Sequence, residues 1–93
     1  MRRVDFSRQA EKSLEKLIKR SPEIARLIAA QIEILCQNPT PANSRKITGY
    51  FCYRARVGSF RVIYEFDDET LFVTVVEKRD KVYQKMGSII PEI

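Results

Sequence analysis

The feature that most constrains the fold is a single change in hydrophobic periodicity, which occurs at Gly49. Before Gly49, apolar residues recur every three to four positions, as they do on one face of an amphipathic helix. After it, apolar and polar residues alternate with a period of two, which is typical of half-buried strands. A chain of 93 residues has room for one domain with one modest core. We therefore expect a single α+β domain over residues 1–93.

Two helices are predicted in the first half of the chain. Ser7 is placed to cap the first helix with its hydroxyl. The apolar positions of this helix are Ala10, Leu14, Leu17 and Ile18. Ser21 caps the second helix, Pro22 occupies its first turn, where the missing N–H costs nothing, and Asn38-Pro39 ends it. Its apolar positions are Ile24, Leu27, Ile28, Ile32 and Leu35. Two such helices with a short joint form an αα-hairpin.

The remaining segments are predicted to be strands and their connections. Residues 3–6 form a short strand, and residues 38–45 form a connecting loop. Gly58-Ser59 is a two-residue hairpin turn, and glycine at its first central position favours type II′. A turn rich in acidic residues at 67–69 leads into a third strand at 70–76. We expect the carboxylates of that turn to be solvated rather than to hold a metal.

The length of the hairpin turn determines which residues of its two strands face each other, because a two-residue loop sets the register. Residues whose numbers sum to 117 are then paired. The pairs on the predicted core face are Val57/Phe60, Ala55/Val62, Tyr53/Tyr64 and Phe51/Phe66. This face is wide enough to receive the two amphipathic helices.

The other face of the hairpin carries an unusual arrangement of positive charge. The net charge of the chain is +5, and residues 45–61 alone carry five basic side chains and no acidic one. The register sets Arg56 opposite Arg61 and Arg54 opposite Ile63. Like charges that face each other across strands destabilise a sheet by up to about 1 kcal/mol. An anion site explains the pair, and arginine favours bidentate phosphate recognition; the alternative is that Glu77 neutralises it.

Composition excludes several classes of function. The chain has no histidine, so no Ser-His-Asp triad or Cys-His dyad can form, and Lys, Arg, Tyr, Asp or Glu must serve any proton transfer. We expect no metal and no cofactor. Cys36 and Cys52 are too few for a disulfide framework and are predicted to be buried thiols in a reducing cytoplasm. The sequence has no apolar run of a signal peptide or a membrane span, which favours a cytoplasmic protein.

Two segments carry a family resemblance. Lys46-Ile47-Thr48-Gly49-Tyr50 and the stretch from Tyr53 to Glu65, which reads Tyr-Arg-Ala-Arg-Val-Gly-Ser-Phe-Arg-Val-Ile-Tyr-Glu, resemble the central hairpin of the RelE/ParE toxin superfamily. These are small toxins of bacterial and archaeal type II toxin–antitoxin systems. The segment 78–83 matches the Arg, Val and Tyr of the family's C-terminal H-R-x-x-V-Y pattern, with Lys78 in place of its histidine. Of the RelE-like and ParE-like branches of this superfamily, the sequence favours the RelE-like branch.

The resemblance implies an α+β fold, in which the N-terminal αα-hairpin packs on a small, mostly antiparallel, twisted sheet. For the RelE-like branch it implies a ribosome-dependent, metal-independent mRNA endoribonuclease. Carried over by position, the implied catalytic residues are Arg54, Arg56, Arg61, Arg79 and Tyr83. The implied RNA-binding residues are Lys46, Lys78 and Lys81. The implied partners are a cognate antitoxin, the ribosome and mRNA.

Two other functions fit the same sequence. A ParE-like toxin would inhibit DNA gyrase and leave RNA intact. A basic module without catalytic activity would bind RNA with a steep salt dependence. Members of the ParE branch generally lack a complete set of arginine, lysine and tyrosine residues for cleavage. The presence of all five implied catalytic residues therefore favours the nuclease.

Overall fold

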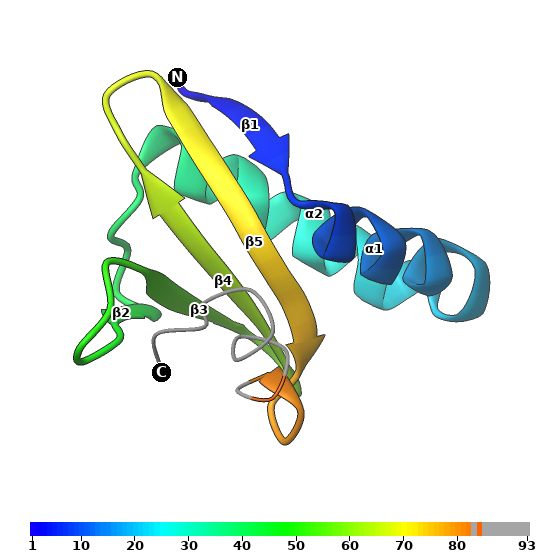
Figure 1. The fold of residues 1–93 in the computed structure, drawn as a ribbon. Coiled ribbons are helices and arrows are strands. Elements are labelled where there is room, and N and C mark those ends of the chain that lie inside the picture. The colour runs from blue at the N-terminus through cyan, green and yellow to red at the C-terminus, as the bar shows by residue number, and fades with distance from the viewer. Residues whose placement is uncertain (83, 85–93) are drawn as a thin grey trace.

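The computed structural model describes residues 1–82 and 84. Its helices lie together on one side of a sheet (Figure 1). In chain order the elements are β1 (Arg3–Phe6), α1 (Arg8–Arg20), α2 (Pro22–Gln37), β2 (Ser44–Lys46), β3 (Tyr53–Val57), β4 (Phe60–Phe66) and β5 (Thr70–Lys78). Within these described residues, no helix is long and apolar enough to cross a membrane.

The sheet has five strands in the order β1-β5-β4-β3-β2. Neighbouring strands are antiparallel except for β1 and β5, which run parallel with Arg3 beside Thr70. The predicted α+β architecture, with an αα-hairpin on a mostly antiparallel sheet, is confirmed. The predicted strand at residues 3–6 is confirmed as well, and the third strand of the sequence prediction extends as far as Lys78.

The predicted N-cap is present at the start of α1, whereas the side-chain cap predicted for α2 is absent. The Ser7 hydroxyl accepts a hydrogen bond from the Ala10 amide at 3.0 Å, as expected of an N-cap. Pro22 occupies the first turn of α2, but the Ser21 hydroxyl makes no capping bond to that helix. Ser21 ends α1 at the same time, because its amide donates to the Leu17 carbonyl at 2.8 Å. This double role sets its backbone outside the usual capping conformation.

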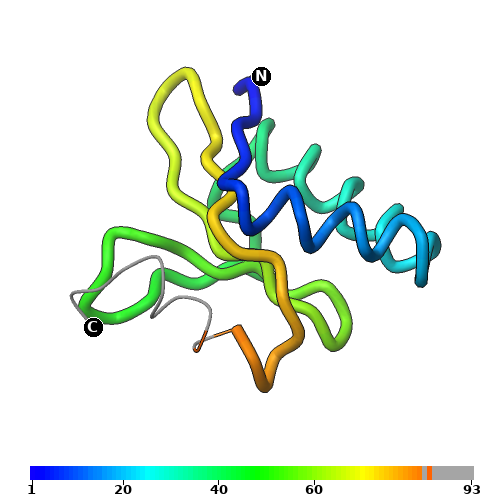
Figure 2. Tube along the Cα trace, turned by 45° about the vertical axis from the view of Figure 1, so that its right-hand side comes forward, coloured from blue at the N-terminus to red at the C-terminus, as the bar shows by residue number. Residues whose placement is uncertain are grey.

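Two residues predicted to face the core are exposed instead. Ile18 is 62% exposed and Leu27 is 61% exposed. The joint between α1 and α2 projects past the edge of the sheet (Figure 2), yet Leu17, next to Ile18, packs against the core, and Ile28, next to Leu27, is fully buried. Ile18 and Leu27 therefore lie at the margins of the two apolar helix faces, and helical periodicity alone overestimates the width of the buried stripe.

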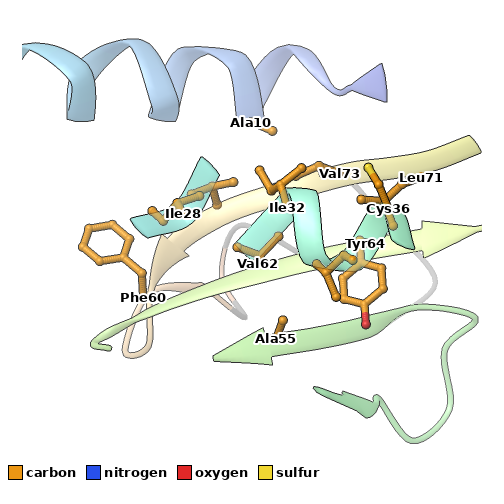
Figure 3. Packing of buried hydrophobic residues seen from close by; sticks show 12 residues of the cluster. Ala10, Ile28, Ile32, Cys36, Ala55, Phe60, Val62, Tyr64, Leu71 and Val73 are labelled. Carbon is orange, nitrogen blue, oxygen red and sulfur yellow. The ribbon is translucent and has the colours of Figure 1, made fainter. Parts of the chain in front are cut away.

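The main core lies between the helices and the sheet (Figure 3). Ala10 of α1 is fully buried there against the side chains of α2 and of the central strands. The fully or nearly fully buried members from α2, β3, β4 and β5 include Ile28, Ile32, Leu35, Cys36, Ala55, Val62, Tyr64, Leu71 and Val73. Both cysteines are free and buried, as predicted, and burial raises the pKa of each thiol.

A second, smaller apolar cluster lies on the opposite face of the sheet. It consists of Cys52, Ile63, Val75 and Val82, with Ile47 and Tyr50 packed against it. We call it the minor cluster. It anchors the connection between β2 and β3 and the segment that follows β5, and the sequence pattern does not predict it.

The segment before the hairpin departs from the prediction. Residues 44 and 45 were assigned to a loop, yet they lie in β2, which pairs with β3. Phe51 was paired with Phe66 on the core face, but it is 88% exposed and β3 begins only at Tyr53. The chain turns between Ile47 and Cys52, where the Ile47 amide donates to the Cys52 carbonyl at 2.9 Å. A strand of three residues is too short for alternation to reveal it.

The turn rich in acidic residues has a structural role. The Asp67 carboxylate accepts hydrogen bonds from the backbone amides of Glu69, at 2.8 Å, and Thr70, at 2.7 Å. These bonds favour the ionised carboxylate and lower the pKa of Asp67. Asp67 therefore holds the turn that leads from β4 into β5.

Replacing Asp67 by asparagine is expected to flatten the acid side of the stability profile. The folded state lowers the pKa of this carboxyl, so its contribution is complete above the unfolded pKa of 3.8 and is lost as the pH falls through the folded value. Urea unfolding of wild type and Asp67→Asn, between about pH 6 and about pH 2.5, measures the effect. Asp68→Asn in the same turn is the control, and a wild-type profile that matches Asp67→Asn would contradict the expectation.

Candidate functional site

Five arginines gather in one cleft on the sheet face that turns away from the helices. The cleft has a volume of about 270 Å³. Its lining residues are Ala42, Asn43, Arg45, Arg54, Arg56, Arg61, Arg79 and Val82. We call it the arginine cleft. No acidic side chain is among these lining residues, so the cleft presents a concentrated positive field.

The hairpin register that sets two of these arginines together is confirmed. Arg56 lies opposite Arg61, and Arg54 lies opposite Ile63. Gly58 has a φ of +57°, and no non-glycine residue in the described part of the chain has a positive φ. Ser59 therefore has a negative φ, as the predicted type II′ turn requires. A tight turn of known length thus places two arginines face to face.

Arg79 enters the cleft from the end of β5. Its amide donates to the Ser59 carbonyl at 2.8 Å, which ties the residue to the turn between β3 and β4. The family resemblance implies a catalytic role for Arg79, and the structure places this residue in the lining of the cleft beside the hairpin arginines. Arginines from β2, β3 and β4 and the arginine that directly follows β5 therefore contribute to one basic surface.

The neutralisation of the arginine pair by Glu77 finds partial support. Glu77 lies opposite Arg61 in the pairing of β4 with β5, so the two side chains share a face. Its carboxylate accepts a hydrogen bond from the Lys78 amide at 3.1 Å. The Arg61 guanidinium donates to the carbonyls of Gly58, at 2.9 Å, and Phe60, at 2.8 Å. One carboxylate beside Arg61 leaves the cleft with a large excess of positive charge.

Arg45 is the residue of the cleft that the sequence analysis did not select. It lies on β2 directly opposite Arg54. The sequence identifies the segment 45–61 as basic, but it predicts that the first residue of this segment, Arg45, ends the connecting loop. The pairing of β2 with β3 brings Arg45 to the cleft, and the concentration of charge in this segment was the available signal.

The three predicted RNA-binding lysines lie outside the lining of the cleft. Lys78 is opposite Phe60, so it belongs to the helix-bearing face of the sheet. Lys46 is opposite Tyr53, and its ammonium group lies 6.0 Å from the centre of the Phe51 ring. Lys81 is exposed in the turn after β5. The remaining predicted catalytic residue, Tyr83, lies outside the described residues.

The chemistry available to the cleft follows from its side chains. Guanidinium groups stay protonated at any physiological pH and donate planar pairs of hydrogen bonds, which suits phosphate oxygens. They stabilise negative charge but do not accept a proton. Across the part of the chain that the structure describes, no group of three or more Cys, Asp or Glu residues is arranged to hold a metal ion.

The fold and the cleft define a small α+β domain with a strongly basic face. Residues 4–83 match the family described as the ParE toxin of the type II toxin–antitoxin system parDE. The chain therefore belongs to this family, and it is a type II toxin of the RelE/ParE superfamily. No curated protein matches the chain.

Solved structures of related toxins have the same fold. The YoeB dimer from Staphylococcus aureus is 15% identical, with 84% of this chain and 97% of that chain covered and a TM-score of 0.75. The archaeal RelE–RelB complex from Pyrococcus horikoshii is 27% identical, with 87% and 98% covered and a TM-score of 0.70. The DinJ–YafQ toxin–antitoxin complex from E. coli is 20% identical, with 88% and 97% covered and a TM-score of 0.72.

Proposed function

We propose that this toxin is a ribosome-dependent mRNA endoribonuclease that needs no metal for the cleavage step. The observation that carries the proposal is the convergence of five arginines on one cleft. Such a cleft is suited to a phosphodiester, whose negative charge increases as the reaction proceeds. Preorganised donors that meet developing charge supply a large part of the acceleration in many enzymes.

In the proposed reaction the substrate supplies its own nucleophile. The 2′-oxygen of one nucleotide attacks the adjacent phosphorus, and the bond from phosphorus to the 5′-oxygen of the next nucleotide breaks. The 2′-hydroxyl loses a proton, and the leaving 5′-oxygen gains one. The products are a 2′,3′-cyclic phosphate and a 5′-hydroxyl. Arg56 and Arg61 hold the non-bridging oxygens, and Arg79 stabilises the charge on the leaving group.

The other residues have supporting roles in this proposal. Arg54 binds phosphate on the β2 side of the Arg56–Arg61 pair. Tyr83, assigned by its resemblance to the family's C-terminal tyrosine, stacks on a base or takes part in proton transfer. Lys46, Lys78 and Lys81 contact RNA outside the cleft, where exposed cations gain affinity from the release of counterions.

Purified toxin with translating ribosomes and a labelled mRNA tests this function. Cleavage is expected to leave a 2′,3′-cyclic phosphate on the upstream product. A 2′-deoxy substitution at the nucleotide that is cut is the control, because it removes the nucleophile and is expected to abolish cleavage at that position. Continued cleavage of the 2′-deoxy substrate, or intact mRNA on a ribosome that binds the toxin, would contradict the proposal.

The family match favours one second candidate, the inhibition of DNA gyrase without RNA cleavage. A supercoiling assay with purified gyrase separates it from the nuclease. The nuclease is expected to leave gyrase active and to cut mRNA, whereas a gyrase inhibitor is expected to stop supercoiling and to leave mRNA intact.

We also propose a cognate antitoxin as a partner, supported by the fold shared with toxins in the RelE–RelB and DinJ–YafQ complexes. An acidic segment that orders on binding would match the basic face of this chain. Action on ribosomes places the toxin in the cytoplasm.

A further inference from the structure

Helix α2 carries an apolar stripe on its solvent side, apart from the residues that pack on the sheet. Leu27 is 61% exposed and Ile34 is 49% exposed. The two residues are seven positions apart, which is close to two full turns, so their side chains lie on the same side of the helix. Ala30 lies between them and is exposed as well. We call Leu27, Ala30 and Ile34 the outer stripe.

The outer stripe has no role in the fold of a single chain. Neither hydrophobic cluster of the described residues includes a member of it. The solvent side of a helix that packs on a sheet normally carries polar and charged residues. The outer stripe departs from that pattern at two large apolar side chains in line with each other. An apolar line of this kind is suited to contact with another protein surface.

Two opposite charges lie along one side of the outer stripe. Arg26 and Glu33 are both exposed, and they too are seven positions apart. When Leu27 and Ile34 are assigned to the a positions of a heptad, Ala30 is at d. Arg26 and Glu33 are then both at g. Charges at g positions, beside an apolar seam, form the ion pairs between helices that determine partner and orientation.

This order of residues is complementary to itself when two helices run antiparallel. In a two-fold arrangement centred on Ala30, residues whose numbers sum to about 60 face each other. Leu27 of each copy then meets Ile34 of the other copy. Arg26 of each copy likewise meets Glu33 of the other, so both charges are paired. In a parallel arrangement each charge would face its own equivalent, so the charges favour the antiparallel one.

We propose that the outer stripe is a homodimer interface, in which α2 packs antiparallel on α2 of a second copy. The self-complementary order of the charges favours a second copy over an unrelated helix. Because α2 has 16 residues and a length of about 24 Å, the contact is small, and the dimer is weak and concentration-dependent. The helices lie on the sheet face opposite to the arginine cleft (Figure 1), so both clefts stay open in the dimer. The inference does not depend on what the cleft does.

Sedimentation of the full chain over a range of concentrations tests the association. A salt concentration of about 0.15 M screens the repulsion between two chains of net charge +5. Wild type is expected to change from monomer to dimer as its concentration rises. Leu27→Ser is expected to weaken the dimer by about tenfold or more, because the lost contact occurs twice. Ile18→Ser removes an apolar side chain of α1 that is 62% exposed, and this control is expected to associate as wild type does.

Charge reversal tests the orientation of the two helices. Arg26→Glu sets two acidic side chains against each other at both ends of the interface, and it is expected to weaken the dimer by about tenfold. Glu33→Arg sets two basic side chains together with the same expected effect. The variant with both changes restores opposite charges and is expected to associate as wild type does. Circular dichroism checks that all three variants are folded. Losses that add up in the double variant would overturn the antiparallel register.

An engineered disulfide tests the position of the two-fold axis. Ala30→Cys places two thiols at the axis, and mild oxidation is expected to link the copies covalently. Ala29→Cys is exposed one position away and turned by about 100°, so it is the matched control and is expected to remain unlinked. The native Cys36 and Cys52 are buried and do not compete. Wild type that stays monomeric at every concentration, or equal linking at both positions, would overturn the interface.

Discussion

Replacement of Arg61 by alanine is expected to slow mRNA cleavage on translating ribosomes by about 10²–10³-fold, the usual cost of losing one donor that stabilises transition-state charge. Arg61 lies opposite Arg56 in the wall of the arginine cleft. Loss of its guanidinium removes a fixed charge from a site that has to stabilise a dianionic phosphorane. The rate is measured under single-turnover conditions with toxin in excess over ribosomes.

A companion variant separates catalysis from folding. The Arg61 guanidinium also donates to the carbonyls of Gly58 and Phe60, so its loss loosens the hairpin turn. Arg56 is exposed and faces the same cleft, so Arg56→Ala tests the charge without those two bonds. Arg26→Ala, an exposed arginine on α2, controls for net charge and is expected to cleave as wild type does. Full cleavage by both cleft variants would show that the arginine pair has no catalytic role.

Replacement of Tyr64 by alanine is expected to destabilise the fold by about 3–5 kcal/mol, a large part of the stability of a small domain. Tyr64 is completely buried, and its ring stacks on Tyr53 with the centroids 5.8 Å apart. Its hydroxyl donates to the Pro39 carbonyl, which ties the segment after α2 to the sheet. Figure 3 shows the Tyr64 ring among the side chains of the main core.

Tyr64→Phe separates the hydrogen bond from the packing. It keeps the ring and is expected to cost about 1 kcal/mol, because one hydrogen bond is lost. Urea unfolding followed by circular dichroism gives both values, with Tyr53→Phe at the half-buried neighbour as control. Burial raises the pKa of Tyr64 above 10.0, so the unfolded chain loses this proton first and wild-type stability falls as the pH rises through that value. The fall is expected to be smaller in Tyr64→Phe, and equal profiles would contradict this account.

Local sequence signals were sufficient wherever the interacting residues are close in the chain. The Ser7 cap depends on an amide three residues away, and the hairpin register depends on a two-residue turn with glycine in a left-handed conformation. Both were predicted correctly. Phe51 was misplaced because alternation was extended through a turn that only the minor cluster stabilises.

Burial along the helices required knowledge of the sheet. Ile18 and Leu27 have the right helical spacing, but their sequence neighbours Leu17 and Ile28 take the positions against the core and leave both exposed. The period of a sequence indicates which face of a helix is apolar, but it contains no information about how far the partner surface extends.

The sequence by itself determined the order of helices and hairpin, and it set Arg56 opposite Arg61, because these depend on short-range backbone geometry. Only the tertiary structure decided that Arg79 and Arg45 join them. Arg79 is placed by the pairing of β5 with β4, and Arg45 by the pairing of a three-residue strand with β3. Such pairings depend on the packing of segments that are distant in sequence. The periodicity of each segment does not determine which residues of two distant segments face each other.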